Sequence, residues 1–133
     1  MKQYNIIIVF SPDKQFILMC SRRKEPYKGI INFIGGKIEP GENHETAAYR
    51  ELYEETSITK EVITLTHLMD FSYIKSEILL EVYYGVLTSM VEVSGDENHL
   101  MWVDANEDFS DINRFAGEGN IYHIMEYIKR YIL

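Results

Sequence analysis

Cysteine is almost absent from the chain, and proline is scarce. One cysteine, Cys20, and three prolines occur among 133 residues. A single cysteine excludes an internal disulfide framework and is typical of proteins in a reducing compartment, so we expect a cytoplasmic location. Because Cys20 lies within an apolar run, we expect it to pack in the core instead of acting as a nucleophile.

Long apolar segments are also missing. The longest purely apolar runs, residues 6–10 and 16–20, are far shorter than the roughly 20 residues that a membrane-spanning helix needs. The first residues show neither the long apolar stretch nor the small-residue cleavage site of a signal peptide. We therefore expect no membrane span and no targeting peptide.

Positive charge is in the minority. The chain has 13 Lys and Arg against 21 Asp and Glu, which gives a net charge of −8. Proteins that bind nucleic-acid polymers draw much of their affinity from basic charge, so we expect no polymer partner. A small phosphorylated ligand remains compatible with this charge, provided that a metal ion mediates the contact.

The hydrophobic residues, 46% of the chain, fall into short segments typical of strands and amphipathic helices. The length is below the roughly 150 residues of an average domain and predicts a single domain over residues 1–133. We expect strands at residues 4–10, 16–21, 30–34, 62–73, 77–87, 91–93 and 100–103, and helices at residues 43–56 and 120–133. This order predicts the α/β (α+β) class, with an α/β/α sandwich around a mixed β-sheet.

Three carboxylates share one face of the first predicted helix. Glu51, Glu54 and Glu55 stand at positions i, i+3 and i+4, where side chains on a helix are neighbours. Like charges at this spacing destabilise a helix by a few tenths of a kcal/mol per pair. Two interpretations remain open: a solvated acidic surface with an Arg50–Glu54 ion pair, or a site for a hard cation such as Mg²⁺ or Mn²⁺, which prefers oxygen ligands.

The residues around these glutamates resemble the Nudix (MutT-like) hydrolase box. The matching positions, all at the family's spacing, are Gly36, Glu42, Arg50, Glu51, Leu52, Glu54, Glu55 and Ile58. Ser57 departs from the box, which has glycine there to end the helix, and we expect a cost of about 1 kcal/mol. Ile31 and Ile34 depart from the nucleoside triphosphate branch, in which tryptophan and proline are common.

The resemblance implies a Nudix-type fold and the hydrolysis of a nucleoside diphosphate linked to another group, assisted by Mg²⁺ or Mn²⁺. It implies that Glu54, Glu55 and the Gly35 carbonyl are metal ligands, and that Glu51 is either a ligand or the general base. Arg50 and Glu42 would form an orienting salt bridge beside the structural Gly36. A further acidic residue is expected before the last strand. Glu97 is our choice as ligand or base, with Asp96 second, although this acidic segment could equally be a solvated surface.

Further residues are candidates for contacts with the phosphates and the base. The candidate phosphate contacts are Arg22, Arg23 and Lys37. Since a nucleobase needs an apolar slot with a few polar groups, the candidate base contacts are Phe33, Tyr73, Tyr83 and Asn120. Asn120 resembles a base-reading asparagine of the triphosphatase branch, and its alternative role is a helix N-cap.

Three functions follow from the resemblance. The first is a pyrophosphohydrolase of nucleoside or deoxynucleoside triphosphates, oxidised ones included, which releases a nucleoside monophosphate and pyrophosphate. The second is a pyrophosphatase of ADP-ribose, nucleotide sugars or dinucleoside polyphosphates; the proline-bearing marker of many ADP-ribose enzymes is missing, since no proline follows Pro40. The third is a non-catalytic ligand sensor, which usually loses box carboxylates. We expect a small-molecule nucleotide as the partner and a monomer or homodimer.

Overall fold

The computed structural model describes residues 1–95 and 97–133. It contains strands β1 (Lys2–Phe10), β2 (Phe16–Arg22), β3 (Ile31–Lys37), β4 (Thr66–Tyr73), β5 (Ile78–Val86) and β6 (Asn98–Asp104). The helices are α1 (His44–Thr56) and α2 (Asn120–Tyr131), the latter preceded by a short 3₁₀ turn, η1 (Gly117–Gly119). No helix in these residues is long and apolar enough to cross a membrane.

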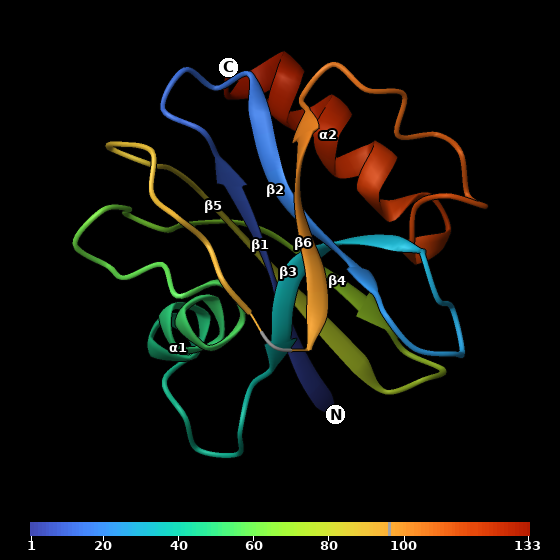
Figure 1. Ribbon diagram of the computed structural model, residues 1–133. Coiled ribbons are helices and arrows are strands. Elements are labelled where there is room, and N and C mark those ends of the chain that lie inside the picture. Colours follow the sequence, from blue (N-terminus) through green and yellow to red (C-terminus); the bar gives the residue numbers. More distant parts are fainter. Residues whose placement is uncertain (96) are drawn as a thin grey trace.

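The strands form one mixed sheet in the order β4-β5-β1-β3-β2-β6, and β1 also pairs with β2. The β1–β5 pair is parallel, and the other pairs are antiparallel. In Figure 1 the two helices lie on either side of this sheet, α1 beside β3 and α2 across the opposite face. The predicted α/β/α sandwich around a mixed sheet is therefore confirmed.

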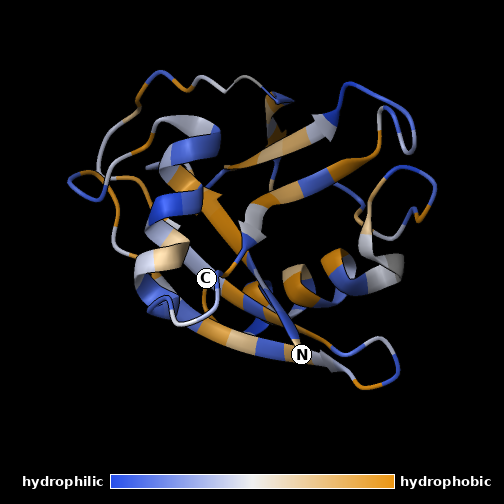
Figure 2. Cartoon of the chain, turned by 90° about the horizontal axis from the view of Figure 1, so that it is seen from below, coloured by the Kyte–Doolittle hydropathy of each residue, from blue (hydrophilic) through white to orange (hydrophobic). Residues whose placement is uncertain are grey.

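Each helix buries one apolar face against the sheet. On α1 the buried residues include Ala48 and Leu52, which pack with Ile7 and Leu18 of the strands. On α2 they are Ile121, Ile124, Met125 and Ile128, which join a second cluster on the other face. Figure 2 shows the apolar stretches along the strands between the helices, and the hydrophilic outer side of the helices. Burying one such aliphatic side chain contributes about 1.5–3 kcal/mol, so packing holds both helices to the sheet.

The ends of α1 follow local capping chemistry. Asn43 is the N-cap, and its side chain accepts a hydrogen bond from the Thr46 N–H at 3.0 Å. At the other end, Ser57 takes the left-handed conformation with φ 68°. The predicted start and end of this helix are confirmed, and Ser57 indeed occupies the position that favours glycine.

Two predicted strand segments are wrong. Residues 62–65 precede β4 as an irregular segment: Ile63 and Leu65 are buried under α1, while the Leu65 N–H donates to the Tyr49 hydroxyl. Residues 91–93 form no strand, although Val91 and Val93 pack against the same cluster. In both cases the apolar residues fill the core from a loop, and their pattern resembles that of a strand.

Strand β3 is longer than predicted. It continues through Gly35 and Gly36 to Lys37, because β1 pairs with it as far as Tyr4 and Lys37. Glycines usually weaken a strand. Here they are needed, because a side chain at Gly35 or Gly36 would collide with neighbouring groups. This extension carries the box glycines along the sheet toward α1.

Candidate active site

Helix α1 and the ends of β2, β3 and β6 enclose an acidic cavity of about 440 Å³. Its lining residues are Cys20, Gly36, Lys37, Glu51, Glu54, Glu55, Glu97, Asn98 and Leu100. Four of the predicted carboxylates thus meet at one cavity, together with the predicted phosphate contact Lys37. The second-choice Asp96 lies outside the described residues.

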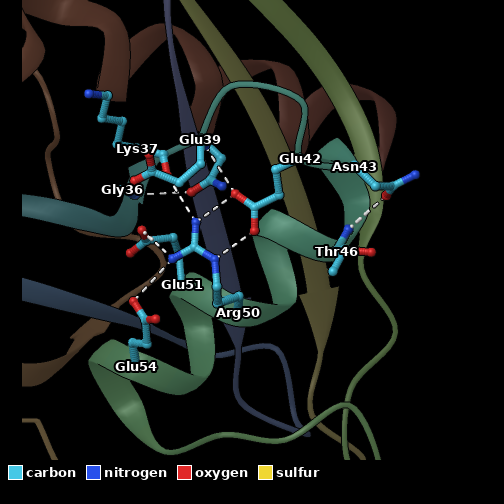
Figure 3. Close-up of polar contacts among 10 residues, drawn as sticks. Gly36, Lys37, Glu39, Glu42, Asn43, Thr46, Arg50, Glu51 and Glu54 are labelled. Carbon is cyan, nitrogen blue, oxygen red and sulfur yellow. Dashed lines mark hydrogen bonds and ion pairs between the residues drawn. The ribbon is translucent and has the colours of Figure 1, made fainter.

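Arg50 connects the carboxylates of the box (Figure 3). Its Nε and Nη2 donate to the two oxygens of Glu42 at 2.7 and 2.8 Å, which is a bidentate pair. Its Nη1 donates to Glu51 at 3.0 Å and to Glu54 at 3.2 Å, and Nη2 also reaches the Lys37 carbonyl at 3.1 Å. The guanidinium lowers the pKa of Glu42 to about 2. One fixed positive charge therefore holds the loop before α1 and two of the cavity's carboxylates together.

Glu55 and Glu51 are the perturbed acids of the cavity. Burial raises the pKa of Glu55 to about 7, even though its carboxylate accepts a hydrogen bond from the Gly35 N–H at 3.0 Å. Burial also raises the pKa of Glu51, against the opposing effect of Arg50. Without a further positive charge, these acids resist ionisation where they stand. The neighbouring Cys20 is a buried wall residue whose thiol pKa is raised to about 12 by burial, so it is no nucleophile.

The two box glycines are required by close approaches. A Cβ at Gly36 would lie 2.2 Å from a carboxylate oxygen of Glu51, and one at Gly35 would lie 2.1 Å from the Asn5 carbonyl oxygen. The Asn5 side-chain oxygen in turn accepts a hydrogen bond from the Gly36 N–H at 3.0 Å. The Gly35–Gly36 segment of β3 is thus packed between β1 on one side and the acids of α1 on the other.

The donor set fits a hard divalent cation. The acidic cavity offers carboxylate oxygens from Glu51, Glu54, Glu55 and Glu97, which is the ligand chemistry of Mg²⁺ and Mn²⁺. As the side chains stand, no three His, Cys, Asp or Glu in the described part of the chain are arranged to share a cation. Arg50 Nη1 lies between Glu51 and Glu54, so a cation would compete with it for these two groups.

A second cavity, of about 720 Å³, lies on the face of the sheet that α2 covers. Its lining residues are Tyr4, Arg22, Tyr27, Ile30, Asn32, Tyr73, Ser76, Ile78, Leu80, Ile112, Phe115, Ala116, Gly117 and Asn120. Three predicted residues meet here: Arg22, Tyr73 and Asn120. The Asn120 amide donates to the Tyr73 hydroxyl. The N-cap of α2 is Gly119, so the alternative role of Asn120 as a helix cap is wrong.

Three predicted contacts lie elsewhere. Phe33 and Tyr83 are each 4% exposed, Phe33 in the cluster under α2 and Tyr83 in the cluster under α1. They are core residues on opposite faces of the sheet, so they do not form a shared base slot. The Tyr83 hydroxyl donates to Glu81 instead. Arg23 is exposed in the loop after β2 and lines neither cavity.

Sequence reasoning missed most of the second cavity, because its residues come from segments scattered along the chain. It also missed Asn5, the acceptor for Gly36. A signal for Asn5 was present: it is a polar residue that directly precedes the apolar run at residues 6–10.

Comparisons with known proteins agree with this geometry. A family model described as NUDIX domain matches residues 1–118. An oxidized purine nucleoside triphosphate hydrolase from Mus musculus is 28% identical over 80 residues, which cover 60% of this chain and 50% of that protein. The chain spans about half or less of the length of the curated relatives that it matches.

Solved structures share the fold. A MutT structure, from work on the enzymes of Aliivibrio salmonicida and Vibrio cholerae, has a TM-score of 0.72 at 24% identity and covers 98% of both chains. A C. elegans Ap4A hydrolase has a TM-score of 0.78 at 18% identity and covers 99% of this chain and 98% of its own. At these identities the likeness establishes the fold alone. The family model, which spans residues 1–118 of 133, establishes more: the chain belongs to the NUDIX domain family.

Proposed function

We propose that this Nudix hydrolase converts a nucleoside or deoxynucleoside triphosphate and water into a nucleoside monophosphate and pyrophosphate, with Mg²⁺ or Mn²⁺ as cofactor. The observation that carries the proposal is the pairing of an acidic cavity with a larger, mainly apolar one. Strand β3 contributes Gly36 and Lys37 to the first and Asn32 to the second. A nucleotide has the same two-part chemistry, a charged polyphosphate and a flat base.

The acidic cavity would act on the polyphosphate. Its carboxylates would hold the cation, which when bound offsets phosphate charge and lowers the pKa of a coordinated water. Among these residues, Glu51, Glu55 or Glu97 would accept the proton of the attacking water. The water oxygen forms a bond to phosphorus while the bond to the bridging oxygen breaks, and pyrophosphate leaves. Lys37, on the cavity wall, would contact the phosphates.

The second cavity would hold the nucleoside. Its apolar walls suit a base, and the amides of Asn32 and Asn120 supply donors and acceptors for the base edge. Arg22 is the cation of this cavity that could reach a phosphate. The register pairs Tyr4 of this cavity with Lys37 of the acidic one, so the two sites meet at the β1–β3 pair. A substrate that spans β3 would engage both.

The similarity to the mouse hydrolase of oxidized purine nucleoside triphosphates supports oxidised purine nucleotides as candidate substrates. The second candidate function is the hydrolysis of dinucleoside polyphosphates, or of ADP-ribose or nucleotide sugars. Tyr73 at the second cavity favours it, because an aromatic side chain there could stack on a second base. A ligand sensor is the least supported function, since Glu51, Glu54 and Glu55 are all present at one cavity.

A nucleotide panel tests the proposal. Purified protein with Mg²⁺ would be incubated with ordinary and oxidised triphosphates, ADP-ribose and dinucleoside polyphosphates, and released phosphate and pyrophosphate would be measured separately. Pyrophosphate from triphosphates supports the first function, and turnover confined to ADP-ribose or dinucleotides supports the second. Binding of nucleotides without any turnover would favour a sensor. The Glu54→Gln variant serves as the control for contaminating hydrolases.

We extend the proposal to the organisation of the protein. Residues 1–133 would act as one hydrolase domain in the cytoplasm, as a monomer or homodimer, with small nucleotides and no nucleic-acid polymer as partners. Light scattering of the purified chain measures the oligomeric state directly. A shift of a labelled RNA or DNA polymer at physiological salt would contradict the expectation about partners.

A further inference from the structure

Asn5 is a buried amide at the centre of the sheet. It lies on β1 immediately before the apolar run Ile6–Phe10, and only 2% of it is exposed. Asparagine is unfavourable inside strands, and a buried polar side chain costs stability unless every polar atom finds a partner. An apolar side chain would suit this buried position better, so the presence of the Asn5 amide needs an explanation.

Its contacts lead to the acidic cavity. The Asn5 side-chain oxygen accepts a hydrogen bond from the Gly36 N–H at 3.0 Å. The Glu51 carboxylate occupies the space on the other side of Gly36, where a Cβ would lie 2.2 Å from it. The Asn5 backbone carbonyl lies against Gly35, whose N–H donates to Glu55. Asn5 therefore binds Gly36 and lies against Gly35, the two glycines that adjoin Glu51 and Glu55.

The other half of the amide adds a second observation. The Asn5 Nδ2 atom is buried and has no hydrogen-bond partner among the residues that the structure describes. The hydrogen bond from Gly36 determines which way the amide faces, so Nδ2 cannot be satisfied by a flip. Native structures contain few unpaired buried donors, so this one needs an explanation.

We propose that Asn5 is a positioning residue of the cation site. By fixing the Gly36 N–H it holds the Gly35–Gly36 segment of β3 where Glu51 and Glu55 can converge on the cavity. Asn5 touches neither cation nor substrate and acts through the glycine backbone. The proposal rests on the proposed function, because it needs the acidic cavity to bind a divalent cation.

Cation binding without substrate tests it. Mn²⁺ affinity would be measured by paramagnetic resonance, and exchange of the Gly36 amide hydrogen by NMR, for wild type, Asn5→Leu and Asn5→Asp. Asn5→Leu removes the acceptor, so Gly36 exchange accelerates and Mn²⁺ affinity falls by about tenfold, as for other groups that orient metal ligands. Asn5→Asp keeps the acceptor oxygen and restores slow exchange and cation binding. If Asn5→Leu fails to fold, Asn5→Ala takes its place.

Ser11→Ala is the matched control. Ser11 is 3% exposed and follows β1 directly, and its hydroxyl bonds to Asp13 and to the Phe16 N–H, away from the glycines. This variant loses buried hydrogen bonds but keeps wild-type Mn²⁺ affinity. Wild-type Mn²⁺ affinity in Asn5→Leu or Asn5→Ala overturns the role of Asn5 alone. Absence of Mn²⁺ binding in the wild type overturns the proposed function and the role of Asn5 together.

Discussion

The acidic cavity and the apolar cavity differ in how the chain builds them. Three of the four carboxylates in the first come from a single helix, within five residues of one another. The second draws its walls from β1, β2, β3, β4, β5, the loop after β6 and the start of α2. The acidic side chains of the first cavity thus follow mostly from the local sequence of α1. The walls of the second cavity come together only when the whole chain folds. The two cavities should therefore respond to mutation in different ways.

The largest effect should come from the acidic cavity. Glu54→Gln removes one carboxylate charge from the proposed cation site and keeps the side chain's shape. We expect kcat to fall by at least about a hundredfold, because a bound metal ion contributes several kcal/mol to the transition state. Glu45→Gln, which changes an exposed acid in the first turn of the same helix, should leave kcat unchanged. Equal kcat values for the two variants would remove the distinction between cavity and surface carboxylates.

Cation binding should stabilise the fold through the same cavity. Since only the folded chain presents the site, Mg²⁺ or Mn²⁺ at about 100 times its dissociation constant should add roughly 2.7 kcal/mol and raise the melting temperature by several degrees. Excess EDTA should abolish both this shift and turnover. A melting temperature that stays flat across the titration would instead support a solvated acidic helix.

The pH dependence of the free energy of unfolding should report on the buried carboxyl group of Glu55. The pKa of this acid is about 7 in the folded state against 4.5 for an ordinary glutamate, so between these values only the folded state retains the proton. The free energy of unfolding therefore falls as pH rises from 4.5 to 7, by on the order of 2–3 kcal/mol. Glu55→Gln should lose most of this slope in urea titrations without divalent cations, and the raised pKa of Glu51 accounts for the remainder. The same slope in both proteins would assign it to other groups.

The apolar cavity should govern substrate choice more than rate. Asn120→Ala removes an amide that the proposed function directs at the base, and one lost hydrogen bond of this kind costs about 1–2 kcal/mol. We expect KM for the preferred nucleotide to rise about tenfold, with kcat changed little. Tyr122→Ala, on an exposed helix position that lines neither cavity, is the control. A fall in kcat for every nucleotide alike would mean that the two cavities are not separable.

The smallest effect lies outside both cavities, at the end of α1. Ser57→Gly relieves a left-handed backbone, worth about 1–2 kcal/mol, but removes the hydroxyl contacts to Ser94, worth about 1 kcal/mol. The net gain in unfolding free energy should be below about 1 kcal/mol by chemical denaturation. A large loss would show that Ser94 anchors this end of the helix.

The elements that could be predicted are those with local causes. Asn43 caps α1 and Ser57 ends it through contacts within a few residues, so both boundaries were visible in the sequence. The irregular segments around Ile63 and Val91 were not, because their apolar side chains enter the core without strand pairing. An apolar pattern reports burial, and burial alone does not specify backbone pairing.

The site divides in the same way. Helical spacing was enough to gather Glu51, Glu54 and Glu55, whereas Phe33 and Tyr83 could not be assigned from sequence. In a sheet covered on both sides, an aromatic strand residue faces one of two cores or a pocket, and only the register decides which. Asn5 depended on register as well, since Asn5 and Gly36, which pair across β1 and β3, are 31 residues apart in sequence.

The contacts of Arg50 also bear on how a cation could bind. It is already bound to Glu42 through two hydrogen bonds while its Nη1 reaches Glu51 and Glu54. When a divalent ion takes those two acids, the guanidinium can give them up and stay anchored to Glu42. Under the proposed function, cation binding would replace one counterion of Glu51 and Glu54 by another, while the Arg50–Glu42 pair continues to hold the loop before α1 to the helix. Without a cation, Arg50 thus supplies the positive charge that offsets the repulsion between Glu51 and Glu54 on this face of α1.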